Sequence, residues 1–258
     1  MKVLRTVAGV RKALGSSRES RDVGLVPTMG AFHRGHLSLF HAAREECDTV
    51  VVSLFVNPAQ FGELADLERY PRDEERDAKL AEEAGVDILF APAADEIYPA
   101  GFQTWVEVEE LGRALEGTFR PGHFRAVATV CLKLFNVVRP RRAYVGQKDA
   151  QQVAVLRRMI RDLELELELR VLPTVRDRDG LALSSRNALL SPEERQRALW
   201  LPRALATKDP VQARELLRDL DVDYLEVADL EPPVLAAAVR VGSTRLIDNV
   251  PLDTEAPK

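Results

Sequence analysis

Long apolar segments are missing from this sequence, and so is any rich use of cysteine. No stretch approaches the roughly 18 apolar residues that a membrane-spanning helix needs. The N-terminal stretch MKVLRTVAGVRKALGSSRES mixes charged with apolar residues, so it lacks the apolar centre of a signal peptide. Its two cysteines, Cys47 and Cys131, lie far apart in apolar surroundings, which favours buried thiols over a disulfide or a metal pair. We therefore expect a cytoplasmic protein with no membrane partner.

An excess of positive charge is also missing. The formal net charge is -5 at pH 7, which argues against nucleic acid or an anionic membrane surface as partner. Between Arg113 and Arg186, however, 15 Lys and Arg residues face 8 Asp and Glu residues. This basic middle would suit a small polyanionic substrate. The alternative is that many of these arginines lie on solvated helix faces, as the pattern VLRRMIRDLE indicates for its own part.

Strands and helices alternate over the first two-thirds of the chain. Apolar runs predict strands at 23–28, 49–57, 86–92 and 142–146, and the strict alternation of LELELELRV predicts another at 163–171. Helical spacing predicts helices at 37–47, 72–85, 128–138 and 149–163. This order predicts an α/β fold with an open, doubly wound parallel sheet, whose ligands bind at the carboxyl ends of the strands.

The residue pattern of the sequence changes after Val175, where a polar loop follows the alternating strands and helices. The polar loop RDRDGLALSSRNALL leads into a helix with Ser191 as N-cap and Pro192 at its first position. A further helix and two strands, at 222–230 and 244–250, are expected near the C-terminus. We predict a first domain at 1–175 and a small α+β domain at 176–258.

Two of the four histidines, His33 and His36, stand where the first predicted strand feeds the first helix, in VPTMGAFHRGHLSLF. A helix start offers unpaired N–H groups and the positive end of the helix dipole, which favour phosphate. Imidazoles one turn apart can donate to phosphate oxygens or hand a proton to a leaving group. A zinc pair or two structural histidines are the alternatives, although the other two histidines offer no obvious further ligands. A Walker-type phosphate loop is absent.

Several motifs carry a resemblance to a known family. TMGAFHRGH resembles the H-x-G-H signature of the nucleotidyltransferase and class I synthetase superfamily. Together with FVNPAQFG, YPRD, EGTFRPGHFRAVATVCLKLFN, GQKDAQQ, DGLALSSRN and RLIDN, it resembles the pantoate–β-alanine ligase family from about Val23 to Asn249. The resemblance implies a Rossmann-like domain at 1–175 that binds ATP and pantoate, a C-terminal lid domain at 176–258, and a homodimer.

The resemblance also implies an activity. Such enzymes condense pantoate with β-alanine to pantothenate through a pantoyl adenylate, and they release AMP and pyrophosphate. Mg²⁺ should accompany the ATP, held mainly by phosphates and water, with no protein metal ligand named. One alternative is a nucleotidyltransferase that adenylylates a phosphate or phosphopantetheine. Another is a non-catalytic, RNA-associated protein. The SSRN motif and a pair of glutamines favour the ligase over the first, and the net charge argues against the second.

The family's functional residues carry over onto matching positions. The implied ATP-binding residues are Met29, Gly30, Ala31, Phe32, His33, Arg34, Gly35, His36, Gly146, Gln147, Lys148, Asp149, Val175, Leu183, Ser184, Ser185 and Arg186. The catalytic ones among them would be His33, His36, Lys148, Ser184, Ser185 and Arg186, with His36 as proton donor to the departing group. The implied pantoate-binding residues are Gln60, Gln152, Asn57 and Tyr70. Arg120 and His123 could contact phosphate or merely shape their loop.

Four departures from the family pattern stand out, one of them Ala126 where the family usually has Gly. Leu183 replaces a usual Met of similar size, which changes little. Arg76 falls where an acidic residue is common, although Asp77 follows it. The segment before residue 222 is short, so the lid domain is expected to be trimmed.

Overall fold

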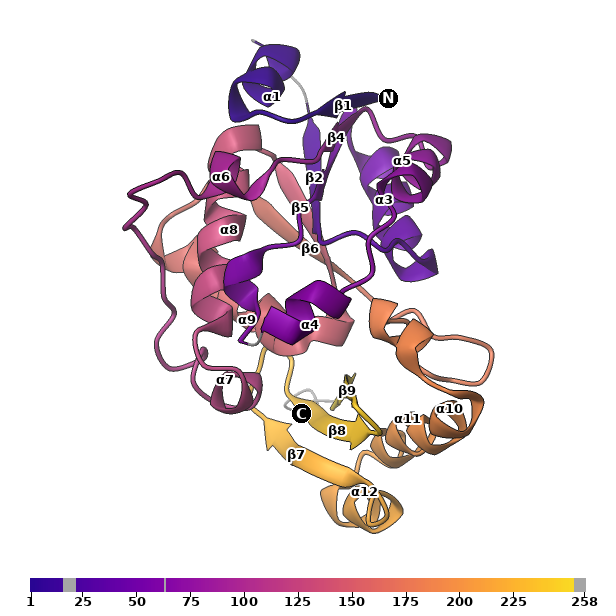
Figure 1. The fold of residues 1–258 in the computed structure, drawn as a ribbon. Helices are drawn as coiled ribbons and strands as arrows, with labels where there is room; N and C mark the ends of the chain where they lie inside the picture. The colour runs from indigo at the N-terminus through magenta and orange to yellow at the C-terminus, as the bar shows by residue number, and fades with distance from the viewer. Residues whose placement is uncertain (16–21, 63, 253–258) are drawn as a thin grey trace.

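The computed structural model describes residues 1–15, 22–62 and 64–252. Its larger sheet has six parallel strands in the order β1-β4-β3-β2-β5-β6 (Figure 1). These strands are β1 (Lys2–Leu4), β2 (Val23–Thr28), β3 (Thr49–Leu54), β4 (Ile88–Phe90), β5 (Arg142–Gly146) and β6 (Glu168–Leu172). The predicted α/β fold with a doubly wound parallel sheet is confirmed.

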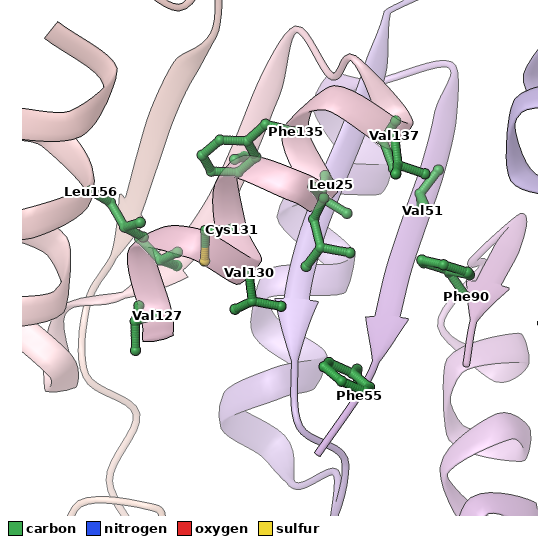
Figure 2. Close-up of a cluster of buried hydrophobic side chains, with 14 of the residues drawn as sticks. Leu25, Val51, Phe55, Phe90, Val127, Val130, Cys131, Phe135, Val137 and Leu156 are labelled. Atoms are coloured by element: carbon green, nitrogen blue, oxygen red, sulfur yellow. The ribbon is translucent and has the colours of Figure 1, made fainter. Parts of the chain in front are cut away.

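Helices cover both faces of this sheet. One face carries α1 (Val7–Leu14), α8 (His123–Val138) and α9 (Ala150–Asp162), and the other carries α3 (Arg34–Glu46) and α5 (Glu74–Glu83). Neighbouring strand residues serve opposite faces, because side chains alternate along a strand. Leu25 packs in the core with α8 and α9, shown in Figure 2, whereas Val26 packs with α3 and α5. Burial on both faces explains why these strands read as continuous apolar runs.

A second, antiparallel sheet follows the first, in the order β7-β8-β9. Its strands are β7 (Asp221–Ala228), β8 (Val234–Val241) and β9 (Thr244–Pro251), and its helices are α10 (Pro192–Ala198), α11 (Trp200–Leu205) and α12 (Pro210–Leu216). Ser191 caps α10 and Pro192 opens it, as predicted. These elements share a hydrophobic core built from Leu181 and residues that follow it. Shorter helices complete the chain: α4 (Leu64–Arg69), α6 (Ala94–Ile97), α7 (Glu116–Phe119), and the 3-10 turns η1 (Pro58–Gln60), η2 (Gln147–Asp149) and η3 (Ser185–Leu189).

Some element predictions need correction. The strand predicted at 163–171 begins only at Glu168, because the chain turns after α9 with Glu164 in the left-handed region at φ 50°. Leu165 and Leu167 reach the core from this turn, so their alternation did not indicate a strand. The short β1 and the strand β8 were not predicted. The β8 sequence VLAAAVRV is rich in alanine, which favours strands only weakly, yet it lies buried at the centre of its sheet.

The strand order places one particular crevice at the centre of the larger sheet. From β2 the chain proceeds to β3 on one side, and β5 lies on the other side of β2. Such a reversal of strand order opens a crevice at the carboxyl ends of the two strands, where ligands bind in open α/β sheets. The segment that starts α3 follows β2, and η2 follows β5.

Both cysteines are free and buried, as predicted. Among the described residues, none of the helices combines the length and the apolar character needed to cross a bilayer.

Candidate functional site

A cavity of about 630 Å³ opens at the carboxyl ends of β2 and β5, and the second sheet contributes to its wall. Its volume lies within the range of small-molecule sites, roughly 300–1,000 Å³. Most of the predicted site residues line it: Met29, His33, Gly35, His36, Gln60, Tyr70, Gly146, Lys148, Asp149, Gln152, Val175, Leu183, Ser184, Ser185 and Arg186. The others are not part of the lining: Gly30, Ala31, Phe32, Arg34, Asn57 and Gln147.

The two histidines themselves cap the helix at whose start they stand. His33 is the N-cap of α3, and its Nδ1 accepts from the N–H of Gly35 at 3.1 Å. The Nδ1 of His36 accepts from the N–H of His33 at 3.3 Å. Backbone N–H groups only donate, so in each ring the proton must be on Nε2. The sequence suggested that the helix start offers its N–H groups to phosphate. The two imidazoles occupy the N–H groups of His33 and Gly35, so these groups are not available to phosphate. The Nε2–H groups of the imidazoles remain to donate instead.

The rings of His33 and His36 lie close together, with centroids 4.1 Å apart. Gly35 permits this arrangement, because a Cβ at position 35 would lie 2.9 Å from Cε1 of His33. Burial, followed by the charge of Lys148, lowers the pKa of His33 to about 4. Burial, followed by the neighbouring His33 and Lys148, lowers the pKa of His36 to about 3. Both imidazoles are therefore neutral at pH 7.

A buried carboxylate, absent from the sequence-based site, shapes the turn before these histidines. Asp77 of α5 accepts from the N–H of Ala31 at 2.6 Å and from that of Phe32 at 2.7 Å. Ala31 has φ 53°, a conformation that costs energy in a residue with a Cβ and persists only when its surroundings hold it. The hydrogen bonds from Asp77 hold Ala31 in this conformation. Ala31 and Phe32 therefore shape the turn, but they are not part of the cavity lining. The only sequence signal was that Asp77 follows Arg76, a position where the family commonly has an acidic residue.

Cations outnumber carboxylates in the cavity wall, where Arg69, Arg120, Lys148, Arg186, Arg240 and Arg245 are exposed to the cavity. Each lining carboxylate already has a cationic partner. The pairs are Asp66 with Arg186 at 3.3 Å, Glu116 with Arg245 at 2.7 Å, Asp149 with Lys148 at 3.6 Å, and Asp248 with Arg176 at 2.6 Å. This balance suits a polyanion, because it provides positive charge within hydrogen-bonding reach of the cavity.

The second predicted signature adjoins the first, because a Cβ at position 35 would lie 3.9 Å from Cβ of Leu183. Ser184 caps η3, with its Oγ accepting from the N–H of Arg186 at 3.3 Å. Ser185 donates its hydroxyl to the Tyr70 hydroxyl at 3.3 Å, so it contacts a residue predicted to bind pantoate. Arg186 lies over the Tyr70 ring, 6.0 Å from its centroid. A segment predicted to bind ATP and a residue predicted to bind pantoate are thus in direct contact.

The amide of Gln60 is oriented by a buried neighbour. Asn57 is fully buried; its Oδ1 accepts from the N–H of Ala59, so its Nδ2 must face Gln60. That Nδ2 donates to Oε1 of Gln60 at 2.8 Å. The Nε2 of Gln60 is then the end that can donate to a ligand in the cavity. Asn57, predicted to line the pantoate pocket, is not part of the cavity lining and instead orients the amide of Gln60.

Arg120 and His123 hold the same glutamine by its backbone. His123 Nδ1 donates to the carbonyl oxygen of Gln60 at 3.1 Å, and Arg120 donates to that oxygen at 3.2 Å. Arg120 also donates to Nε2 of His123. Burial, then the charge of Arg120, lowers the pKa of His123 to about 4. The sequence did not decide between a phosphate contact and a loop-shaping role for these two residues. In the structure, both shape the loop that carries Gln60.

The buried neutral histidines should make stability depend on pH. The folded pKa values of His33, His36 and His123 lie below the ordinary value of 6.5, so the unfolded chain binds more protons below that pH. Stability should be full above pH 6.5 and fall towards pH 4, by up to about 1.4 kcal/mol per histidine and pH unit. Urea unfolding at pH 7.5, 6 and 5 measures the slope. The His123→Gln variant should show a smaller slope, and equal stability at pH 7.5 and 5 would contradict the expectation.

Comparisons with known proteins identify the family of this chain. A sequence model described as pantoate-beta-alanine ligase matches residues 2–251. A pantothenate synthetase from Moorella thermoacetica is 50% identical over 280 aligned positions, covering 98% of this chain and 99% of the relative. Pantothenate synthetase 1 from Bradyrhizobium diazoefficiens is 52% identical, covering 98% of each chain. The first alignment is longer than the 258 residues here, so it includes positions that this chain lacks.

Solved structures give the same result. The crystal structure of pantothenate synthetase from Thermus thermophilus matches with a TM-score of 0.92 and 48% identity, covering 97% of this chain and 99% of that chain. A pantoate-beta-alanine ligase from Francisella tularensis, crystallised with beta-gamma ATP and beta-alanine, matches with a TM-score of 0.89 and 33% identity, covering 97% of each. On the strength of the family match, the identities and the shared structure, this chain belongs to the pantoate–β-alanine ligase family.

Proposed function

We propose that the chain condenses pantoate with β-alanine in an ATP-dependent reaction that proceeds through pantoyl adenylate and yields pantothenate, AMP and pyrophosphate. The observation that carries this proposal is the placing of two kinds of groups in one cavity. His33, His36 and Lys148 can receive phosphates, and Gln60 and Gln152 can receive an organic acid. The Francisella relative, crystallised with an ATP compound and β-alanine, supports the choice of substrates.

In the first step, the pantoate carboxylate attacks the α-phosphorus of ATP and pyrophosphate departs. The amides of Gln60 and Gln152 hold the carboxylate without a strong ion pair, which would weaken it as a nucleophile. Lys148 and Arg186 offset the charge that builds on the departing phosphates. His36 is neutral, so we replace the role of proton donor with that of hydrogen-bond donor through Nε2–H, and His33 acts likewise.

In the second step, the amine of β-alanine attacks the acyl carbon of the adenylate, and AMP leaves with the electrons of the broken C–O bond. This step needs alignment rather than a protein nucleophile. Consistent with that, the described cavity wall contains no charged thiol: Cys131 lines the cavity, and burial raises the pKa of its thiol to about 12.

Mg²⁺ is proposed to accompany the ATP. Among the described residues, no three His, Cys, Asp or Glu side chains gather in a way that could hold a metal ion. The lining carboxylates are each engaged by a cation, as described above. Phosphate oxygens and water therefore suit the ion better than a protein cage, and the ion would supply further charge neutralisation on the phosphates.

The deciding experiment is incubation of the pure protein with ATP, pantoate, β-alanine and Mg²⁺. AMP and pantothenate should appear in equal amounts, and both should depend on all three substrates. Formation of ADP, or no AMP at all, would eliminate the ligase function. Transfer of AMP to phosphopantetheine in place of pantoate would instead support a nucleotidyltransferase.

The Gln60→Ala variant should use pantoate poorly. Loss of an amide that donates to a carboxylate costs about 1.5–3 kcal/mol, which corresponds to roughly a 10- to 100-fold lower kcat/KM for pantoate. The KM for ATP should change little. Steady-state kinetics with varied pantoate measures the effect. The control is Gln212→Ala, which replaces an exposed glutamine of α12. Unchanged pantoate kinetics in Gln60→Ala would refute the assignment.

Three further features are proposed from the resemblance. The first domain would comprise residues 1–175, and residues 176–258, which include the second sheet, would form a trimmed lid. The functional unit would be a homodimer, which sedimentation velocity of the pure protein tests directly. The enzyme would act in the cytoplasm, and fluorescence microscopy of a tagged chain tests that location.

A further inference from the structure

The segment that carries Lys148 is held from the other sheet. Lys148 lies in η2, and neither η2 nor the following helix α9 has a side-chain cap of its own. Instead, Nδ2 of Asn249, on β9, donates to the carbonyl oxygen of Lys148 at 2.8 Å and to that of Gln147 at 3.1 Å. Gln147 returns a hydrogen bond from its Nε2 to Oδ1 of Asn249 at 3.3 Å. Asn249 thus holds two backbone carbonyl groups of η2 from a strand about a hundred residues along the chain.

The residue before it, Asp248, is also held by several hydrogen bonds. Asp248 is buried, and it receives a paired hydrogen bond from Arg176 at 2.6 and 3.1 Å. It also accepts from the N–H of Asn249 at 2.8 Å. Arg176 follows Val175, where the chain leaves the first sheet for the second. Two consecutive residues of β9 therefore bind the link between the sheets and the segment that bears Lys148.

We propose that Asn249 is a positioning residue for Lys148, so that docking of the second sheet sets the place of the lysine at the cavity. This inference rests on the proposed ligase function and deepens it. Carbonyl oxygens accept only, so Nδ2 is the end that matters, and it fixes two consecutive carbonyls of η2 at once. Asn249 is buried and is not part of the lining of the 630 Å³ cavity; it lines only a smaller adjoining pocket of about 50 Å³. Its Nδ2 is engaged by the two carbonyls of η2, so we assign it an action through Lys148.

Adenylate formation should depend on this contact more than the later step does. Lys148 is assigned to the departing phosphates, which have left before β-alanine attacks. In Asn249→Ala, the single-turnover rate of pantoyl adenylate formation should fall at least tenfold. The rate at which preformed adenylate reacts with β-alanine should stay within twofold, as should the KM for pantoate.

A double-mutant cycle with Lys148→Ala separates positioning from general damage. If Asn249 acts through Lys148, the double variant should form adenylate no more than twofold slower than Lys148→Ala alone. Additive losses would overturn the proposal, and so would equal slowing of both steps or an unchanged rate in Asn249→Ala. Asn249→Asp provides a second variant, because a carboxylate of the same shape cannot donate to the two carbonyls; it should slow adenylate formation at least as much.

The control variant is Val239→Ala, a truncation in β8 of a buried side chain that packs in the core with α10, α11 and α12. It should lower the Tm as Asn249→Ala does, yet leave adenylate formation within twofold of the unmodified enzyme. A matching loss of rate in this control would show that the effect of Asn249 is only structural. If the unmodified enzyme forms no pantoyl adenylate, the proposed function fails. If it forms adenylate and Asn249→Ala does so equally well, only the present inference fails.

Discussion

The His36→Ala variant should form pantoyl adenylate about 100- to 1,000-fold more slowly than the unmodified enzyme, the loss usual when one charge-stabilising donor is removed. The variant loses the Nε2–H donor that faces the cavity. It also loses the Nδ1 acceptor that holds the N–H of His33, so the second imidazole becomes less fixed. Affinity for pantoate should change less than threefold, because the glutamine amides are untouched.

Rapid-quench single turnovers with labelled ATP measure this rate, and equilibrium dialysis measures pantoate binding. His41→Ala is the matched control, since His41 is an exposed histidine of the same helix. Adenylate formation unchanged in His36→Ala would refute the role. The pH dependence separates the two mechanisms: a hydrogen-bond donor predicts a flat rate from pH 6 to 8 as far as His36 is concerned, whereas a required imidazolium predicts a falling rate.

Arg245→Ala should cost about 3 kcal/mol of the free energy of unfolding, because it removes the shortest ion pairs of two buried carboxylates and leaves them only Arg120 at 3.7 Å and Arg240 at 3.2 Å. Arg245 of β9 donates to both oxygens of Glu116 at 2.7 Å and also pairs with Asp223 at 2.5 Å. The side chains of Glu116 and Asp223 are only 6% and 8% exposed. Burial disfavours the charge of Glu116, but the hydrogen bonds and charge of Arg245 prevail and lower its pKa.

Urea unfolding measures the loss, and Arg240→Ala is its matched control. Arg240 pairs with the same Asp223, but its side chain is 47% exposed, so its removal should cost no more than about 1 kcal/mol. Adding Glu116→Gln to Arg245→Ala should recover part of the stability, because a neutral amide replaces the stranded charge. Equal losses in Arg245→Ala and Arg240→Ala would contradict the account.

Hydrophobic patterns within single segments predicted the elements whose formation depends mainly on the residues of that segment. The strands at 23–28 and 142–146 were predicted to the residue, because continuous apolar runs between polar turns are specific to buried parallel strands. The turn at 163–167 was missed, because alternating leucines can reach a core from a turn as well as from a strand. The strand β8 was missed because alanine favours strands only weakly. This segment forms a strand because it pairs with β7 on one side and with β9 on the other.

Most of the site residues predicted through motifs line the cavity, but many other lining residues, such as Arg240 and Arg245, were not predicted, nor were the residues that hold the site in place. Asp77, Glu116 and Asn249 act through partners 45 to 129 residues away, at distances in the chain that no local motif spans. The sequence also placed phosphate on free backbone N–H groups of the first helix. Only the structure reveals that the imidazoles occupy those groups, because ring orientation is set by packing.

The pairing of every lining carboxylate with a cation has a consequence for solution conditions. The arrival of ATP at Arg186 or Lys148 exchanges one anionic partner for another, rather than filling bare positive charge. Added salt screens the pairs of the empty enzyme as well as the new contacts with the nucleotide. Nucleotide affinity should therefore decline only gently with ionic strength, and a chain so arranged would tolerate large changes in the salt of its surroundings.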